Sequence, residues 1–250
     1  MREELTIRGG LVVTGGPDGI VVGDVVVEGE RISGVGVEAA HGGREIDATG
    51  CLVIPGLVQA HVHLGQTLFR GLADDMDVIE WLRERIWPLE QAHDRCSVKA
   101  SAALGIAELL TGGTTAALSM ESVSYTDAVF EAAEELGIRA TIGKALMDRW
   151  EPGTEMWGEE TDEGWRDQIR LVETWHGAAN GRIHVALSPR GPRNATVETW
   201  KRCVSLAEEA DLRLHTHVNE NKDQANLLGD SPEGRDVEFL AGVGALSERL

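Results

Sequence analysis

From residue 52 onward, the sequence alternates between short apolar stretches and longer amphipathic stretches. The apolar stretches predict strands at 52–60, 114–120, 139–146, 183–188 and 212–218. Helical periodicity predicts helices at 77–87, 95–111, 125–136, 162–178, 196–210 and 233–250. Asp94 and Thr196 are suitable N-caps, and Gly112 and Gly137 are suitable C-terminal stops. Regular strand–helix alternation implies a parallel sheet or barrel with helices packed outside it.

The first part of the chain, to about residue 50, has a different pattern. Short β-type runs occur at 5–8, 10–13, 25–29 and 31–35. Turns rich in glycine and aspartate separate these runs, and the segment shows no helical period. We therefore expect a small antiparallel sheet module ahead of the α/β part of the chain.

Composition excludes several classes of partner. The net charge of −19 is spread over the 250 residues, which argues against nucleic acid and anionic membranes. No apolar run approaches the ~20 residues of a membrane span, and the N-terminus lacks a secretory signal, so a cytoplasmic protein is expected. The cysteines are three and far apart, at Cys51, Cys96 and Cys203. They fit neither a disulfide framework nor a cysteine-rich zinc site, so we expect reduced thiols in packed positions.

Two histidines, His61 and His63, stand at the end of the first predicted strand of the α/β part. Side chains two residues apart on a strand point to the same face, so the two imidazoles would lie side by side. Neutral imidazole is the commonest protein ligand for zinc and similar metals. The pair is thus either half of a metal site or two unrelated polar residues where a strand leaves the core.

The end of the fifth predicted strand supplies further candidates. His217 could be a third imidazole at the same edge of the sheet, because sites form where parallel strands end. Three neutral ligands leave a position for water, whose pKa the metal lowers toward neutrality. Glu220, three residues later, could then move protons between water, substrate and leaving group. His215 shares a strand face with His217 but lies one layer deeper, which is more typical of a packed barrel histidine. Lys144 and Asp148 lie near the end of the third predicted strand, where a surface role is at least as plausible.

Taken in order, the motifs resemble the amidohydrolase superfamily, and within it the metal-dependent aminohydrolases that deaminate purine-like, pterin-like and triazine rings. The matching segments are PGLVQAHVH at 55–63, LFRGLADD at 68–75, WL at 81–82, IWPLE at 86–90, GTT at 113–115 and THVNE at 216–220. One histidine pair is weak evidence, but the ordered set covers essentially the whole chain.

The resemblance implies a fold and a domain arrangement. The family fold is a distorted (β/α)8 barrel with a β-sandwich built from both chain ends. We therefore predict an α/β chain with an N-terminal β-sandwich segment at 1–53 and a partial TIM-type barrel, strands one to five, at 54–250.

The resemblance also implies residue roles. It makes His61, His63 and His217 ligands of one divalent metal, with zinc as the first expectation and iron as the alternative. Glu220 becomes the proton-transfer carboxylate, and Gln66, Glu90 and Arg190 become candidate substrate contacts. The fourth strand, 183–188, has no lysine that could bridge two metals, which favours a single-metal enzyme.

The implied reaction is hydrolytic deamination of a purine- or pterin-like ring by a metal-bound hydroxide, with a small heterocycle as the partner and homo-oligomerisation left open. Gln66 and Arg190 can both donate to a carbonyl oxygen, which favours an oxo-amino ring. Glu90 instead matches relatives with nucleoside substrates. The simpler interpretations are a polar helix-start residue for Gln66 and a salt-bridged loop for Arg190.

The chain departs from the family pattern in one respect. Relatives carry a histidine at the end of strand six and an aspartate at the end of strand eight, and no residue here can be assigned to either position. Two alternatives to an active deaminase therefore stand. One is an inactive truncated remnant or an assembly partner, and the other is a triazine hydrolase, which shares the first reaction step.

Overall fold

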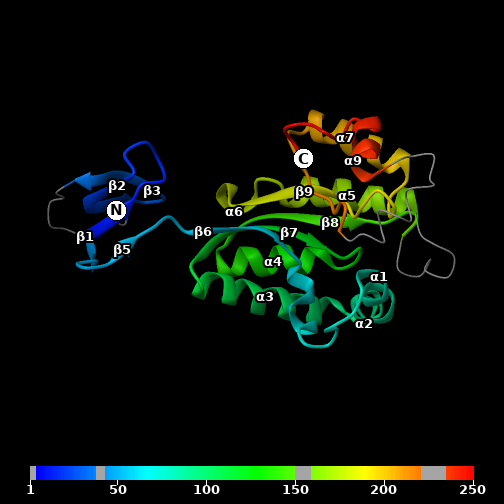
Figure 1. The fold of residues 1–250 in the computed structure, drawn as a ribbon, viewed down its shortest axis with the longest axis horizontal. Helices are drawn as coiled ribbons and strands as arrows, with labels where there is room; N and C mark the ends of the chain where they lie inside the picture. Colours follow the sequence, from blue (N-terminus) through cyan, green and yellow to red (C-terminus); the bar gives the residue numbers. More distant parts are fainter. Residues whose placement is uncertain (1–3, 38–42, 150–158, 221–234) are drawn as a thin grey trace. The chain divides into compact units, whose positions relative to one another are not determined.

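The computed structural model describes residues 4–37, 43–149, 159–220 and 235–250 (Figure 1). Contacts divide the chain into two compact units, Met1–Leu57 and Val58–Leu250. Each unit has its own sheet, and each is described by itself.

The first unit is a mixed sheet with strand order β3-β2-β1-β4, in which β5 also pairs with β1. Its strands are β1 (Glu4–Val13), β2 (Ile20–Glu28), β3 (Arg31–Val37), β4 (Arg44–Asp47) and β5 (Leu52–Val53). The pairs β1–β2 and β2–β3 are antiparallel, as expected. However, β4 and β5 run parallel to β1 along its other edge, so the expectation of a purely antiparallel module is wrong. The sequence did not predict β4, and the predicted strand at 52–60 is divided between β5 of this sheet and β6 (Leu57–Val62) of the second unit.

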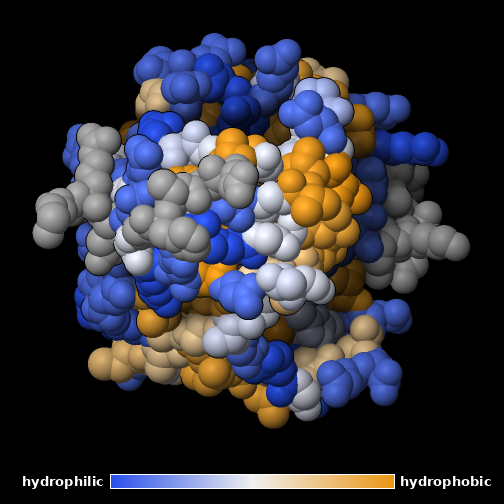
Figure 2. All heavy atoms as spheres, turned by 90° about the vertical axis from the view of Figure 1, so that its left-hand side faces the viewer, coloured by the Kyte–Doolittle hydropathy of each residue, from blue (hydrophilic) through white to orange (hydrophobic). Residues whose placement is uncertain are grey.

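Both polar and apolar side chains cover the surface, and Figure 2 shows hydrophobic residues beside hydrophilic ones on the visible face. Exposed large apolar residues of the first unit include Ile20, Val22 and Ile32. Within this sheet, the Arg8 guanidinium of β1 joins its strand to both neighbours, through Asp24 of β2 (3.1 Å) and Glu45 of β4 (2.6 Å).

The second unit is built on a five-stranded sheet of order β10-β9-β8-β7-β6. Its strands are β6 (Leu57–Val62), β7 (Thr114–Glu121), β8 (Arg139–Leu146), β9 (Ile183–Pro189) and β10 (Arg213–Leu214). The pairs β7–β8, β8–β9 and β9–β10 are parallel. This arrangement is consistent with part of a TIM-type barrel and confirms the predicted α/β class with a parallel sheet.

Strand β10 is much shorter than the predicted 212–218, and its neighbour explains the difference. The ladder reaches His215, whose N–H donates to the Leu187 carbonyl at 3.0 Å. The next bond in that parallel register would need an N–H from Pro189, which has none. Beyond this point the chain stays beside β9 through a bond from the His217 N–H to the Arg190 carbonyl at 3.2 Å.

Helices connect the strands of the second unit (Figure 1). They are the 3-10 helix η1 (Leu64–Phe69), α1 (Val78–Trp81), the π-helical turn η2 (Leu82–Ile86), α2 (Trp87–Ala92), α3 (Arg95–Thr111), α4 (Thr126–Leu136), α5 (Thr161–Trp175), α6 (Ala178–Gly181), α7 (Val197–Glu209) and α9 (Asp236–Gly242). The predicted caps are confirmed: Asp94 and Thr196 accept from backbone N–H groups, and Gly112 and Gly137 follow the helix ends.

Two helix predictions need correction. The predicted helix at 77–87 continues to Ala92, because α2 follows directly on the π-helical turn η2 and Pro88 stands at this change of helix type. The first two residues of the last predicted helix, 233–250, lie outside the described residues. In the described part, helix α9 ends at Gly242. Gly244 then takes a positive φ of 80° and turns the chain. Within residues 235–250, the predicted helix is therefore longer than the observed helix α9.

The sheet and helices enclose two apolar clusters. The first includes the fully buried Ile106 of α3, Phe130 of α4 and Ile142 of β8. The second includes Trp200 of α7 and Leu187 of β9. Burial of such side chains contributes roughly 1.5–3 kcal/mol each, so the helices are held on the sheet by its apolar faces.

Two polar residues after or within β8 are structural. Lys144 is buried and pairs with the Glu159 carboxylate. Asp148 accepts from the Thr196 N–H at 2.8 Å and from the Thr199 hydroxyl at 2.6 Å, which fixes the start of α7. The surface role considered for Lys144 and Asp148 is therefore wrong, because each charged group is bonded to other parts of the protein rather than only to solvent.

The cysteines are all free, but only Cys203 is buried, whereas Cys51 and Cys96 are exposed. The expectation of packed thiols is thus wrong for two of them. Within the described ranges, no helix is long and apolar enough to cross a membrane.

Candidate metal centre

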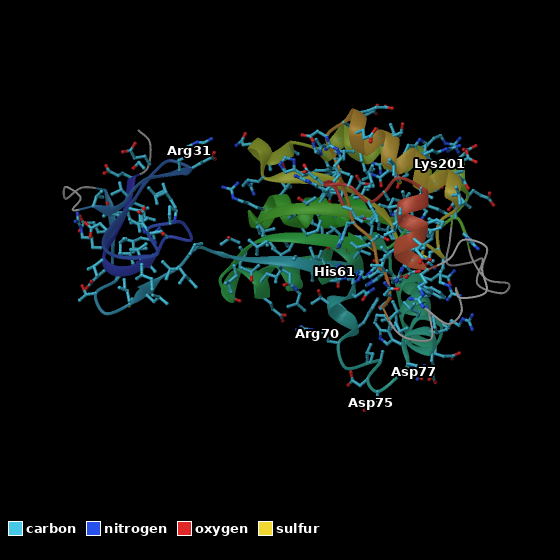
Figure 3. All side chains as sticks on the ribbon, turned by 45° about the horizontal axis from the view of Figure 1, so that its top comes forward. Arg31, His61, Arg70, Asp75, Asp77 and Lys201 are labelled. Carbon is cyan, nitrogen blue, oxygen red and sulfur yellow. The ribbon has the colours of Figure 1, made fainter. Side chains whose placement is uncertain are left out.

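Four imidazoles meet where β6 and β10 end, and Figure 3 labels His61 at the end of β6. The Nε2 atoms of His63 and His217 are 3.2 Å apart. The Nδ1 atom of His61 is 2.8 Å from Nε2 of His215. His61, His63 and His217 each offer one ligand atom within 4.8 Å of the others. The structure thus brings together the three histidines predicted as metal ligands.

Backbone carbonyls orient two of the three rings. His63 donates from Nδ1 to the Met120 carbonyl at 2.6 Å, and His217 donates from Nδ1 to the Arg190 carbonyl at 2.8 Å. A carbonyl can only accept, so the ring hydrogen of each neutral imidazole lies on Nδ1. Both Nε2 atoms therefore present lone pairs to the same point, as in metal sites where the outer nitrogen is held by a carbonyl.

Electrostatics keep these rings neutral. Burial, with contributions from Arg190 and the neighbouring histidines, lowers the pKa of His63 to about 3. Burial also lowers the pKa of His217. Neutral imidazoles are the form that binds a divalent metal. Two facing lone pairs with no hydrogen between them fit a cation and would otherwise repel, so the donor set fits a metal of the zinc type.

The turn after His63 is held by a buried carboxylate that the sequence did not single out. Glu121, at the end of β7, accepts from the Leu64 N–H at 3.2 Å and from the Gly65 N–H at 2.8 Å. Burial raises the pKa of Glu121 to about 7 despite these bonds. The only sequence signal for Glu121 was a polar residue at a strand end. Its carboxylate fixes the chain immediately after the candidate ligand His63.

The three predicted substrate contacts form one network. The Gln66 amide donates to Oε1 of Glu90 at 2.8 Å, and the Arg190 guanidinium donates to Oε2 at 3.1 Å. Arg190 is buried, so its charge is balanced chiefly by Glu90. The network occupies both carboxylate oxygens and lies beside the metal centre.

A pocket joins this network to the histidines. Its lining includes His63, Gln66, Trp81, Leu82, Arg190, Gly191, Pro192, Arg193, Asn194, His217, Glu220 and Asp236. Glu220 is exposed and shares this lining with two of the candidate ligands. Glu90 is not part of the lining but holds two residues that are. Within the described residues, the ligand cluster contains histidines alone and no carboxylate.

The structure also shows contacts that sequence reasoning missed. His215 was expected to be a packed histidine, and it is buried, but it also contacts His61. His93 lies between its Ser97 hydroxyl partner at 2.8 Å and the Gly65 carbonyl at 2.9 Å. The His215–His61 and His93–Gly65 contacts have no local sequence signal, because each joins segments that are distant in the chain.

Comparison with known proteins agrees with this geometry. The model of the amidohydrolase family matches residues 52–243. A 5'-deoxyadenosine deaminase of Methanothermobacter thermautotrophicus is 37% identical over 250 residues, covering 99% of this chain and 56% of the relative. The chain thus spans about half the length of the curated relatives it matches.

Solved structures share the fold. A triazine hydrolase of Arthrobacter aurescens superposes with a TM-score of 0.89 at 24% identity, covering 100% of this chain and 59% of that one. An adenosine deaminase of Xanthomonas campestris, solved with bound zinc, has a TM-score of 0.80 at 27% identity, covering 99% and 56%.

Proposed function

Because this chain belongs to the amidohydrolase family, we propose that it carries the metal-binding part of an aminohydrolase that removes an amino group from a purine-like ring. The observation that carries the proposal is the pair of Nε2 lone pairs that His63 and His217 direct at one point. A divalent metal held by these rings and His61 would supply Lewis-acid activation of water.

The proposed role of Glu220 is proton transfer. Its carboxylate lines the same pocket as His63 and His217 and is open to solvent. An exposed carboxylate near a reacting carbon can take a proton from water and deliver it to a ring nitrogen or to the leaving amine. A neutral amide at this position would keep the shape and lose the proton acceptor.

The proposed substrate contacts are Gln66, Glu90 and Arg190. Glu90 ties the Gln66 amide and the Arg190 guanidinium into fixed positions through one bond to each. Groups held in this way lose little freedom on binding, which favours a defined ring orientation. The remaining donors of Gln66 and Arg190 are the ones available to a ring.

The substrate class follows from the relatives rather than from the pocket chemistry. Curated relatives of this chain are named as deaminases of 5'-deoxyadenosine and of methylthioadenosine or S-adenosylhomocysteine. We therefore propose an adenine nucleoside with a modified 5' position, ahead of the oxo-amino ring that Gln66 and Arg190 favoured. Each Glu90 oxygen already accepts one bond, from Gln66 or from Arg190, so Glu90 would accept from the ribose hydroxyls of such a substrate through its remaining lone pairs.

The test is ammonia release by the zinc-loaded 250-residue chain and by the longest open reading frame that contains it. The panel contains 5'-deoxyadenosine, methylthioadenosine, adenosine, guanine, a pterin and a chlorotriazine. We expect turnover of the 5'-modified adenosines, with Glu220→Gln reducing kcat by about 100-fold or more and Glu80→Gln, at an exposed glutamate of α1, leaving it unchanged. Release of chloride alone would favour the triazine hydrolase. No turnover on any member of the panel, with metal bound, would favour the inactive remnant.

A further inference from the structure

His215 lies against His61. Among the described residues, no backbone carbonyl contacts the His61 ring in the way that carbonyls hold the rings of His63 and His217. The Nε2 atom of His215 is 2.8 Å from Nδ1 of His61, and the two rings cross at 76°. His215 is 8% exposed and follows β10 directly, so β9 and β10 fix its backbone. His61 therefore has an imidazole where His63 and His217 have backbone carbonyls.

An imidazole partner differs from a carbonyl because it can donate or accept. A bond between two neutral imidazoles contains one hydrogen, and its position sets the tautomer of both rings. If His215 donates from Nε2, the hydrogen of His61 must lie on its own Nε2, which then cannot bind a metal. If His215 accepts at Nε2, His61 donates from Nδ1 and its Nε2 lone pair is free. The two tautomers are thus linked.

We propose that His215 is a positioning residue for the metal centre: it accepts the Nδ1 hydrogen of His61 through Nε2 and so holds His61 as an Nε2 ligand. This inference rests on the proposed metal centre and adds a residue outside the ligand set. In the metal-bound state, the hydrogen of His215 itself then lies on Nδ1.

The surroundings of His215 support a role in the site rather than in the fold. Its Nδ1 atom is buried and has no hydrogen-bond partner among the described residues. An unsatisfied buried polar atom weakens the folded state, and an apolar residue of similar size would avoid that cost. The interaction with His61 is therefore the benefit that the ring provides at this position.

Zinc affinity tests the inference through two matched variants. His215→Leu keeps the volume and removes the acceptor, whereas His215→Gln keeps an acceptor oxygen on a side chain of similar reach. Zinc dissociation constants are measured by competition with a chromophoric chelator, beside His61→Ala and the control His184→Leu, a histidine of β9 outside the cluster. We expect His215→Leu to weaken zinc binding by about 10- to 100-fold. His215→Gln should restore most of it, and His184→Leu should match the parent chain.

Two further readouts separate positioning from packing. Metal-free His215→Leu should unfold at the same or a higher temperature than the parent chain. Nitrogen-15 NMR of the zinc-loaded parent should show His215 as the neutral tautomer protonated on Nδ1. If His215→Leu does not fold, His215→Gln and the tautomer still decide the question.

The inference is overturned if His215→Leu binds zinc like the parent, if Leu and Gln weaken binding equally, or if zinc-loaded His215 is protonated on Nε2. A parent chain that binds no zinc overturns the metal centre itself, which is a different result from a bound metal insensitive to residue 215.

Discussion

The Nε2 atoms of His63 and His217 face each other at 3.2 Å, although each ring has already given its hydrogen to a carbonyl through Nδ1. No hydrogen bond can join two acceptors, so the contact is unfavourable until a cation lies between them. A protein that builds such a contact just beyond the ends of two separate strands is preorganised for a metal.

Removing a ligand should therefore abolish zinc-dependent stabilisation. Zinc binds the folded state, so it should raise the unfolding temperature of the parent chain in a concentration-dependent manner. His217→Ala should show no such rise and should retain less than one zinc per chain by elemental analysis. His184→Ala, outside the cluster, should behave like the parent. An equal zinc response in His217→Ala and the parent would contradict the assignment of His217 as a ligand.

Glu121 should make stability depend on pH in a defined direction. Burial raises its pKa to about 7, above the ordinary 4.5, so between these values the folded state holds a proton that the unfolded state has released. The free energy of unfolding should therefore fall as pH rises through this window and level off above it. Glu121→Gln, which does not titrate, should lack this part of the fall.

Urea unfolding of the metal-free proteins at several pH values between about 5 and 8 measures the effect. The relevant quantity is the parent value minus the Glu121→Gln value, because the histidine contributions then cancel. Parallel profiles for the two proteins would show that Glu121 titrates normally in the folded state.

The Lys144–Glu159 pair should be sensitive to the loss of its acid. Lys144 has no exposed side-chain surface, and Asp167, at 3.8 Å, is a second acidic neighbour among the described residues. Glu159→Gln leaves a buried ammonium without its main partner, which should cost about 3 kcal/mol of unfolding free energy. Glu198→Gln breaks an exposed pair with Arg202 on α7 and should leave the unfolding midpoint nearly unchanged. Equal midpoints for the two variants would mean that Lys144 finds another partner.

Glu90→Gln should separate substrate binding from chemistry. The amide keeps the volume but no longer balances the buried Arg190 charge, and one of its two groups now donates instead of accepting. The variant is made in whichever protein turns over 5'-modified adenosines, the 250-residue chain or the longer one that contains it. We expect KM to rise by about 10-fold or more, with a smaller change in kcat. A fall in kcat at unchanged KM would place Glu90 in the chemical step.

Much of the site was predictable because it depends on local pattern and on one rule of topology. His61 and His63 alternate on a strand, and parallel strands end at one edge of their sheet, so His217 could be assigned to the same place. The caps at Asp94 and Thr196 were equally local. These features follow from residue type and spacing.

Strand β10 shows where that reasoning stops. The apolar run at 212–218 is a good strand by its own residues, but its length is set by Pro189 on the neighbouring strand. No property of the run itself contains this information. For the same reason, the residues of β4 do not by themselves indicate that this strand pairs with the free edge of β1.

The sequence by itself determined the strand–helix alternation of the second unit, the α/β class and the residues able to bind a metal, but it did not predict β4 or α6. Only the tertiary structure decided which way each imidazole points and what holds it. His61 and His215 are 154 positions apart, and Glu121 lies 57 positions from the Leu64 N–H that it accepts. Such contacts are set by the packing of distant strand ends, where the hydrogen-bond partner of a ring nitrogen fixes its tautomer, and periodicity along the chain does not encode that partner.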